Sequence, residues 1–225
     1  MYKVLIAFIP DSLKKKIGKL VFQWVKEKNR IQSAKLPNVQ INEAVIKNTK
    51  LLLNREKLLE HLPKKGIVAE LGVDEGNFSE VILNKCQPEK LHLIDIWASE
   101  IYNNAKRKYV EERFDPEIRS GIVEINLGYS TEIGAKFKDN YFDWIYIDTD
   151  HSYETTIREL EIWRLKVKEG GIIAGHDFIV GYWDGMIRYG VIEAVYQFCS
   201  KYHWELLYLT MEVDTHPSFA IKRLI

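Results

Sequence analysis

The sequence predicts an α/β domain built on a doubly wound, mostly parallel β-sheet. Short apolar runs rich in β-branched residues recur along the chain after Gly66, and segments of helical length separate them. Such runs are typical of strands buried on both faces, and their alternation with helices favours parallel strand–helix–strand units. The 225 residues are 46% hydrophobic, 28% charged and 12% aromatic, which is typical of one folded domain or of one domain with an appendage.

Five apolar runs are the predicted parallel strands: residues 67–71, 91–96, 122–125, 142–147 and 171–174. The clearest helix between them covers 152–167, where apolar residues recur every three or four positions and form one stripe. Ligands of such sheets bind beyond the carboxyl ends of the strands. We therefore expect the functional residues where these runs end.

The first quarter of the chain differs from the rest in charge. Residues 1–60 carry a net charge of +8, and residues 61–225 carry −8. We predict a basic amphipathic helix over 12–28 and a second helix over 42–62 that ends at Pro63. The chain thus divides into a basic helical cap, residues 1–63, and a main domain, residues 64–225. The basic helix either covers one end of that domain or serves a membrane surface or an anionic substrate.

Charge and cysteine content exclude several classes of protein. The 32 basic and 32 acidic residues cancel, so the field of a general nucleic-acid binder is absent and we expect no nucleic-acid partner. Cys86 and Cys199 cannot form a disulfide framework, which favours a reducing, cytoplasmic compartment. The apolar run 2–10 is too short to span a bilayer, so we expect no membrane span. We expect a homo-oligomer.

A glycine-containing turn follows the first predicted strand, in the segment Glu70-Leu71-Gly72-Val73-Asp74-Glu75-Gly76. Gly72 and Gly76 let the backbone approach a ligand closely. The spacing is not GxGxxG, which disfavours a loop that cradles the pyrophosphate of a dinucleotide. The Glu70 carboxylate at the strand end suits a cationic ligand group better than a phosphate.

The second predicted strand ends at Asp95, twenty-five residues after Glu70. An acidic side chain there can accept hydrogen bonds from both hydroxyls of a ribose. A nucleoside without a pyrophosphate is therefore the natural ligand. The third strand ends in the turn 126–130, which either borders an adenine ring with Tyr129 and Ser130 or is an ordinary strand-to-helix turn.

The fourth and fifth strand ends carry a concentrated set of carboxylates and imidazoles. The fourth reads Asp148-Thr149-Asp150-His151, and the fifth reads Gly175-His176-Asp177. Carboxylate oxygens suit Mg²⁺, Mn²⁺ or Ca²⁺, and a ligating histidine shifts the preference towards Mn²⁺, Fe²⁺ or another transition metal. Asp150 or Ser152 can alternatively cap the helix that follows.

At these residues the sequence resembles the class I S-adenosylmethionine-dependent methyltransferases. Within that class it is similar to the subfamily of macrocin-type sugar O-methyltransferases and cephalosporin-hydroxylase-like proteins. The resemblance covers residues 67–223 through four segments in the family's order: ELGVDEGNFS, DWIYIDTDHSYE, EGGIIAGHDF and SFAIKR. It implies a Rossmann-like, seven-stranded sheet whose last strand is antiparallel, with residues 204–210 and 218–222 as the final hairpin.

The resemblance also implies the roles of individual residues. Glu70, Gly72 and Gly76 would surround the methionine part of S-adenosylmethionine, Asp95 would hold its ribose, and Tyr129 and Ser130 would lie near its adenine. A divalent metal, Mg²⁺ or Mn²⁺, would bind Asp148, His176 and Asp177, where relatives more often carry Asp-Asn or Glu-Asp at the last two positions. His151, three residues after the metal-binding aspartate, would be the general base. His61, His92, His203 and His216 are interpreted as structural.

The leading hypothesis is a metal-assisted O-methyltransferase that acts on a hydroxyl of a sugar or a sugar-bearing small molecule, anionic if the basic cap contacts it. One alternative uses Asp148, His151 and His176 as a non-haem iron site for oxidation. Another is a non-catalytic, cofactor-binding subunit, and the glycine pattern disfavours an NAD-dependent dehydrogenase. The aromatic loop 178–185 either stacks on a sugar or closes as a lid, or it packs against the N-terminal helices.

Overall fold

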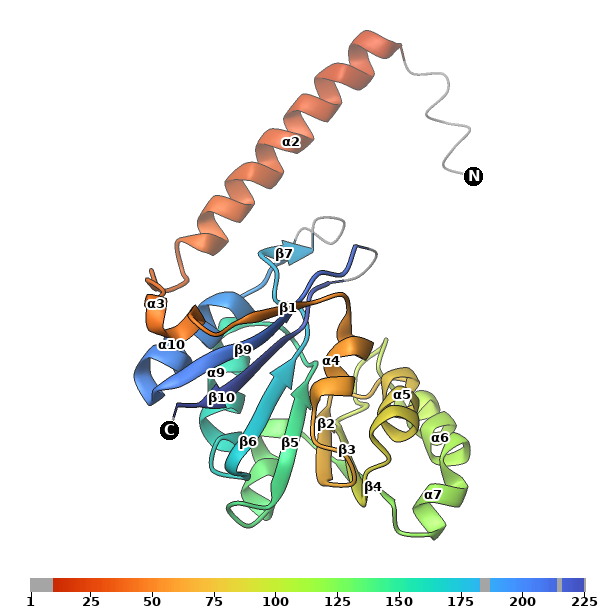
Figure 1. The fold of residues 1–225 in the computed structure, drawn as a ribbon. Helices are drawn as coiled ribbons and strands as arrows, with labels where there is room; N and C mark the ends of the chain where they lie inside the picture. The colour runs from red at the N-terminus through yellow and green to blue at the C-terminus, as the bar shows by residue number, and fades with distance from the viewer. Residues whose placement is uncertain (1–9, 183–186, 214–215, 225) are drawn as a thin grey trace. The chain divides into compact units, whose positions relative to one another are not determined.

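The structure is a computed structural model that describes residues 10–182, 187–213 and 216–224. Strands and helices alternate along most of the chain (Figure 1). The strands are β1 (Lys50–Leu52), β2 (Ile67–Leu71), β3 (Lys90–Asp95), β4 (Val123–Leu127), β5 (Phe142–Ile147), β6 (Val167–Gly175), β7 (Gly181–Tyr182), β8 (Ile187–Arg188), β9 (Trp204–Thr210) and β10 (Phe219–Arg223). The helices are α2 (Asp11–Ser33), α3 (Glu43–Ile46), α4 (Arg55–His61), α5 (Asn77–Cys86), α6 (Asn104–Arg113), α7 (Asp115–Arg119), α8 (Ser130–Ile133), the 3₁₀ helix η1 (Gly134–Lys136), α9 (Tyr153–Trp163) and α10 (Val191–Tyr202).

Within the described residues, one sheet of eight strands has the order β1-β9-β10-β6-β5-β2-β3-β4. Strands β2 to β6 pair in parallel, and β10 runs antiparallel to both β6 and β9. The predicted α/β architecture and mostly parallel sheet are confirmed. The predicted count of seven strands is not, because β1 pairs in parallel with β9, Lys50 opposite Tyr208, and adds an eighth.

The prediction of one helix over 42–62 is wrong. Two short helices flank β1 there, and each begins at an asparagine: Asn42 accepts a hydrogen bond from the backbone N–H of Ala44, and Asn54 accepts one from that of Lys57. Between the two helices, Thr49 Oγ1 donates to the Leu206 carbonyl at 2.6 Å and aligns β1 with β9. Tertiary pairing of the backbone thus overrides the helical pattern of the side chains.

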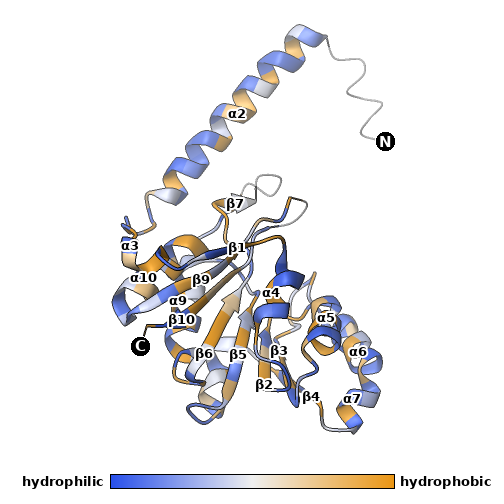
Figure 2. Cartoon of the chain, viewed as in Figure 1, coloured by the Kyte–Doolittle hydropathy of each residue, from blue (hydrophilic) through white to orange (hydrophobic). Residues whose placement is uncertain are grey.

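Side chains of the central strands alternate between two apolar clusters. Ala69 and Leu71 belong to the cluster covered by α8, α9 and α10, whereas Val68 belongs to the cluster covered by α4, α5 and α6. Figure 2 shows hydrophobic strands between helices that carry hydrophilic residues. Both faces of the sheet are therefore buried, and polar site residues concentrate at the strand ends.

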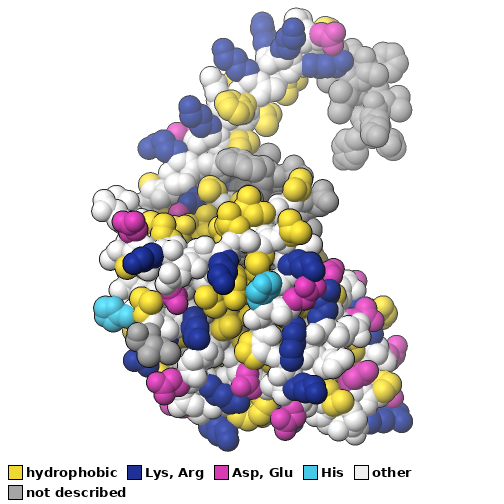
Figure 3. All heavy atoms as spheres, viewed as in Figure 1, with side chains coloured by type: hydrophobic (Ala, Val, Ile, Leu, Met, Phe, Trp, Pro, Cys, Tyr) yellow, Lys and Arg dark blue, Asp and Glu magenta, His cyan; other side chains and the backbone are white. Residues whose placement is uncertain are grey.

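The chain divides into two compact units, which are described separately. The smaller unit holds the described residues up to Pro37 together with β7 and β8. The basic helix predicted over 12–28 is confirmed as α2, and Figure 3 shows Lys and Arg side chains along it. At its end, Gln32 Oε1 and Ser33 Oγ accept hydrogen bonds from the backbone N–H and the Nε of Arg188, both at 3.2 Å.

The larger unit includes α3, β1 and α4, so the compact units divide at Pro37, and the boundary at residues 63 and 64 stays a prediction. Residues 183–185 of the aromatic loop 178–185 lie outside the described residues. So do residues 2–9 of the apolar N-terminal run 2–10. Among the described helices, none is both long enough and apolar enough to cross a membrane.

Candidate active site

Backbone hydrogen bonds that continue past the strand ends place the residues after β2, β5 and β6 side by side. The Asp148 N–H donates to the Leu71 carbonyl at 2.7 Å, and the His176 N–H donates to the Ile147 carbonyl at 2.9 Å. Asp148 and His176 therefore follow neighbouring strands at the carboxyl edge of the sheet. This is the edge where parallel α/β sheets bind ligands.

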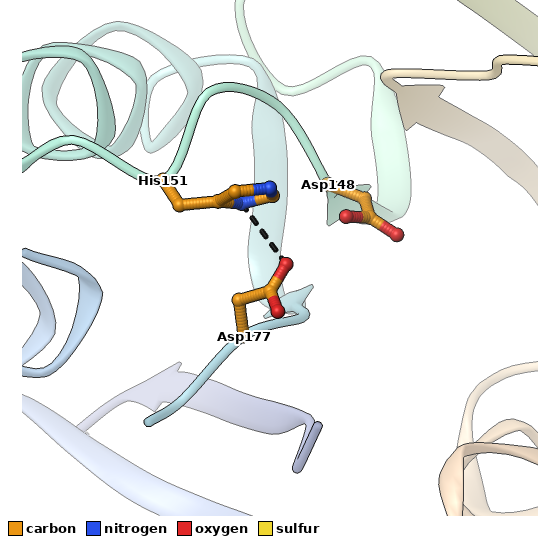
Figure 4. Close-up of side chains that lie close together, drawn as sticks. All are labelled: Asp148, His151 and Asp177. Atoms are coloured by element: carbon orange, nitrogen blue, oxygen red, sulfur yellow. Dashed lines mark ion pairs between the residues drawn. The ribbon is translucent and has the colours of Figure 1, made fainter. Parts of the chain in front are cut away.

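Asp148, His151 and Asp177 form a cluster at this edge, and the His151 and Asp177 side chains point toward one another (Figure 4). One potential ligand atom of each residue lies within 4.8 Å of the others. His151 Nδ1 is 3.0 Å from Asp177 Oδ2. His176 Nδ1 is 3.3 Å from the same oxygen and 3.7 Å from Asp148 Oδ2. The structure thus brings together the predicted base and all three predicted metal-binding residues.

The local backbone explains how these side chains converge. His151 and Asp177 have φ values of 60° and 57°, in the left-handed region that few non-glycine residues adopt. The His151 carbonyl accepts a hydrogen bond from the Gly190 N–H at 2.9 Å, which holds its loop. Ser152 caps α9 through the Thr155 N–H, and Asp150 accepts hydrogen bonds from Ser152. Ser152 therefore has the capping role, and Asp150 holds the Ser152 side chain in place.

Mutual contacts between the histidines and the carboxylates determine the charges of the cluster. Burial opposes charge on His176, but its hydrogen bonds and charge interactions with Asp148 and Asp177 together outweigh burial and raise the pKa of His176 to about 9. Burial also opposes charge on His151, but the hydrogen bond to Asp177 and the charges of Asp177 and Asp148 together outweigh it and raise the pKa of His151. The two histidines in turn hold the pKa of Asp177 well below its usual range, despite burial. Asp177 is therefore an anion that binds two imidazoles.

His216 was interpreted as structural, and the structure places it at the cluster, where its Nδ1 contacts Asp177 Oδ1 directly. His216 precedes β10, and its distance along the chain from the other motifs concealed this proximity. A signal existed in the predicted antiparallel last strand. Such a strand begins at the edge where the parallel strands end, so the residues before it lie near the site.

The glycine-containing turn packs against this cluster. Glu70 is 2% exposed and accepts a hydrogen bond from Ser79 Oγ, and burial raises its pKa to about 8. Gly72 and Gly76 have φ values of 86° and 74°, which favour glycine. Gly76 is also the N-cap of α5, so unpaired N–H groups of the helix begin immediately after the turn.

Asp95 organises the turn from the end of β3. Its Oδ2 accepts hydrogen bonds from the N–H groups of Val73 at 2.8 Å and Asp74 at 3.1 Å, and its Oδ1 accepts one from Trp97 at 2.9 Å. The Trp97 indole donates to the Asp74 carbonyl at 2.9 Å and closes the arrangement. A carboxylate has about four lone-pair sites, so three hydrogen bonds leave about one for a ligand.

Tyr129 and Ser130 follow β4 and differ in environment. Tyr129 is 58% exposed, whereas Ser130 is buried and donates a hydrogen bond to Glu159 Oε1. Thr149 Oγ1 donates to the other oxygen of Glu159 at 2.9 Å. Glu159 was not predicted, although it lies three residues after buried Thr156 on the inner face of α9. It ties the turn after β4 to the loop after β5.

Arg55 is a second residue that the sequence did not indicate. Its guanidinium lies 4.4 Å from the centre of the Phe78 ring, and its Nη1 is 3.9 Å from Asp148 Oδ2. The side chain is 31% exposed. Arg55 begins α4, so a residue of the predicted cap supplies a positive charge to the edge of the cluster.

The donor set fits a divalent metal ion. Two carboxylates and at least one imidazole lie close enough to share one ion, and mixed oxygen and nitrogen donors suit transition metals better than Mg²⁺. His176 Nε2 is buried and has no hydrogen-bond partner among the described residues. The turn also fits a nucleoside ligand through the acceptor site that remains on Asp95. Glu70 is buried and bound to Ser79, and its raised pKa favours the neutral acid.

Comparisons with known proteins concern the family and the fold of the chain. Residues 69–178 match the family model described as a methyltransferase domain. The TrmK tRNA methyltransferase of Bacillus subtilis has a similar structure, with a TM-score of 0.55, 11% identity and coverage of 77% of this chain and 67% of that chain. SMU.1697c, a candidate methyltransferase of Streptococcus mutans solved in complex with S-adenosylhomocysteine, has a TM-score of 0.55, 14% identity and coverage of 76% and 96%. Together these findings support a class I S-adenosylmethionine-dependent methyltransferase.

At these identities the structural likeness establishes the fold alone. The fold is shared by an enzyme of another name, the spermidine synthase of Thermotoga maritima. It has a TM-score of 0.51 and 22% identity, and the match covers 77% of this chain and 57% of that chain. No curated protein sequence matches the chain. The family description names no acceptor group and does not distinguish the macrocin-type subfamily among methyltransferases.

Proposed function

We propose that this chain is an S-adenosylmethionine-dependent O-methyltransferase that methylates a hydroxyl of a sugar or a glycosylated small molecule with the help of a divalent metal. The observation that carries the proposal is the contact of His151 Nδ1 with Asp177 Oδ2, at 3.0 Å, beside Asp148 and His176. A hydroxyl must lose its proton to accept a methyl group. A base held next to a metal-type donor set serves that need.

His151 is the proposed general base. Bound S-adenosylmethionine would supply a methyl group already activated by its sulfonium, so the protein must mainly orient the acceptor and remove its proton. In the neutral imidazole, Nδ1–H donates to Asp177, and this tautomer leaves the lone pair of Nε2 for the hydroxyl proton. A base positioned in this way typically contributes about 10²–10⁴-fold to the rate.

Asp148, His176 and Asp177 are the proposed metal ligands. The distances from His176 Nδ1 to both carboxylates, 3.3 and 3.7 Å, support a shared ion. A divalent ion would supply positive charge that lowers the pKa of an acceptor hydroxyl and fixes its position. Of the two ions, Mg²⁺ and Mn²⁺, the imidazole nitrogen of His176 favours Mn²⁺.

The cofactor is proposed to bind along the turn after β2. Glu70, Gly72 and Gly76 would contact its methionine part, and Asp95 would offer its remaining acceptor site to the ribose. Tyr129 and Ser130 would border the adenine. The exposed ring of Tyr129 supports this role, whereas the Ser130 hydroxyl is already bound to Glu159.

An anionic acceptor is proposed from the charge of residues 1–63, which we propose to act as a cap over the site. The net charge of +8 on residues 1–60 supports attraction of an acidic or phosphorylated glycoside. Arg55 adds a partly exposed guanidinium beside Asp148.

The test combines cofactor binding with methyl transfer. Calorimetry with S-adenosylhomocysteine and with NADH should show binding of the first alone. Transfer of a radiolabelled methyl group from S-adenosylmethionine to neutral and acidic glycosides, with Mn²⁺ or EDTA, then identifies the acceptor. His151→Ala should keep S-adenosylhomocysteine affinity and lose about 10²-fold or more in turnover. The exposed His61→Ala is the matched control, and equal turnover in all three proteins would contradict the proposed base.

A second candidate is a non-haem-iron-type oxygenase on the same fold. It is favoured by the two imidazoles, His151 and His176, that lie with Asp148 in the cluster, because two histidines and one carboxylate form a common iron site. Failure to bind S-adenosylhomocysteine, together with tight binding of Fe²⁺, would favour this candidate. Retained S-adenosylhomocysteine binding without transfer to any glycoside would favour a non-catalytic subunit.

A further inference from the structure

His216 contacts Asp177 on a different oxygen from the other two histidines. His216 Nδ1 contacts Oδ1, whereas His151 Nδ1 and His176 Nδ1 lie 3.0 and 3.3 Å from Oδ2. The Asp177 side chain is 5% exposed. His216 therefore engages the carboxylate oxygen that does not face the cluster, and Oδ2 is left to the proposed metal site.

The residues directly after His216 are fixed to the sheet. The Phe178 N–H donates to the Pro217 carbonyl at 2.9 Å, so the backbone just after Asp177 pairs with the backbone just after His216. Tyr146 and Ser218 share a hydrogen bond at 2.8 Å between their hydroxyls, and Ser218 is fully buried. These bonds hold the His216 backbone in register with Asp177.

Aromatic contacts fix the plane of the His216 ring. Its centroid lies 6.2 Å from that of His176, with the two rings 26° apart. Tyr189 is 8% exposed and packs edge to face on His216, with 5.9 Å between the ring centroids. The centroid of the Tyr189 ring is 4.8 Å from that of His151. A ring held by two aromatic neighbours and one carboxylate has little freedom to turn away.

We propose that His216 is a positioning residue of the metal site, which holds Asp177 Oδ1 so that Oδ2 is presented to the ion. This inference rests on the proposed metal-assisted function. Carboxylates that bind metals are commonly oriented by a hydrogen bond to their second oxygen, and loss of such a partner typically weakens metal binding by about 10–100-fold. The hairpin of β9 and β10 would thereby contribute to a site otherwise built from the loops after β5 and β6.

The test measures metal binding without turnover. Protein freed of metal with EDTA is titrated with MnCl₂, and unbound Mn²⁺ is counted from its electron paramagnetic resonance signal. His216→Ala should weaken Mn²⁺ binding by about 10–100-fold. His216→Asn, whose amide nitrogen stands where Nδ1 stands, should restore most of the affinity. His203→Asn, a change at an exposed histidine with a left-handed backbone that Asn tolerates, is the matched control.

The outcomes separate this inference from the proposed function. Unchanged Mn²⁺ affinity in His216→Ala would overturn the positioning role, even if the thermal unfolding midpoint falls, and would leave metal assistance intact. Equal losses in His216→Ala and His216→Asn would also overturn it, because the hydrogen bond would then not be the cause. If the unaltered protein does not bind Mn²⁺, both the metal site and this inference fail. Calorimetry with S-adenosylhomocysteine still tests the methyltransferase function.

Discussion

A Cβ atom on Gly72 would lie 1.8 Å from the carbonyl oxygen of Asp148. The turn after β2 and the loop after β5 therefore touch through their backbones, and only glycine permits the contact. We expect Gly72→Ala to lower the free energy of unfolding and to displace Asp148. The left-handed backbone alone costs a non-glycine residue about 1–3 kcal/mol, and the steric conflict adds to this cost.

Gly121→Ala separates the two contributions. Gly121 has a φ of 80°, close to the 86° of Gly72, but no atom lies within 4 Å of its ideal Cβ. Urea unfolding should therefore show a larger loss of stability for Gly72→Ala than for Gly121→Ala. Equal losses in the free energy of unfolding would mean that backbone strain alone destabilises Gly72→Ala, and that the backbone of Asp148 can move to accept the added Cβ.

The stability of the protein should fall in mild acid because of His92. Burial among Phe137, Tyr141 and Phe142 lowers the pKa of His92 from 6.5 to about 4, although Glu124 opposes the shift. Between these pH values the unfolded chain takes up a proton and the folded chain does not. The free energy of unfolding should therefore decrease as the pH falls from 6.5 to 4, by at most about 3 kcal/mol.

Urea unfolding of the protein and of His92→Leu at several pH values measures this contribution. The stability difference between the two should change across pH 4 to 6.5, while His61→Leu, at an exposed position, should follow the unaltered protein. A constant difference for His92→Leu would show that His92 is not the group responsible.

Glu159 should have the opposite effect on stability. Burial raises its pKa from 4.5 to about 7, although hydrogen bonds from Ser130 and Thr149 oppose the shift. The folded chain keeps this proton up to about pH 7, whereas the unfolded chain loses it near pH 4.5. The free energy of unfolding should therefore decrease as the pH rises between these values, by at most about 3 kcal/mol.

Glu159→Gln removes the titrating group with little change in shape. Its stability should vary less between pH 5 and pH 8 than that of the unaltered protein in chemical unfolding. Glu154→Gln, at an exposed position on the same helix, is the control. If Glu159→Gln retains the full pH dependence, the buried proton does not reside on Glu159.

Asp95→Asn should weaken binding of S-adenosylhomocysteine. The carboxylate accepts hydrogen bonds from the N–H groups of Val73, Asp74 and Trp97, and an amide nitrogen in place of one oxygen would face at least one of these donors. The proposed ribose contact would also lose a charged acceptor. A hydrogen bond to a charged group contributes about 1.5–3 kcal/mol, so we expect a loss of affinity of about tenfold or more. Calorimetry checks this, with exposed Asp139→Asn as the control. Unchanged affinity would remove Asp95 from the binding site.

Most of the sheet could be predicted because its strands are continuous apolar runs. β2 and β5 match the predicted residues 67–71 and 142–147, since burial on both faces keeps these runs apolar apart from Glu70 and Asp143 near their ends. β1 could not be predicted in this way. Its three residues, Lys50, Leu51 and Leu52, are partly or fully exposed, and backbone pairing with β9 makes them a strand.

The candidate site divides in the same manner. Asp148, His151, His176 and Asp177 were found because each follows a recognisable strand. Glu159 was missed because a glutamate on an amphipathic helix is usually solvated, and its burial depends on two hydroxyls from other segments. His216 was missed because its partner is distant in sequence and close only through the antiparallel final strand.

The pairing of β1 with β9 makes the two ends of the chain depend on each other during folding. Lys50 lies opposite Tyr208, so this part of the sheet forms only after the chain has been synthesised as far as β9. Until then, β1 has no partner and β6 has an open edge, and an unpaired strand edge is prone to join other chains. A truncation that removes residues 1–52 would therefore delete more than the helical segment. It would leave β9 as an open edge, and the shortened protein should aggregate more readily than one cut at Pro37.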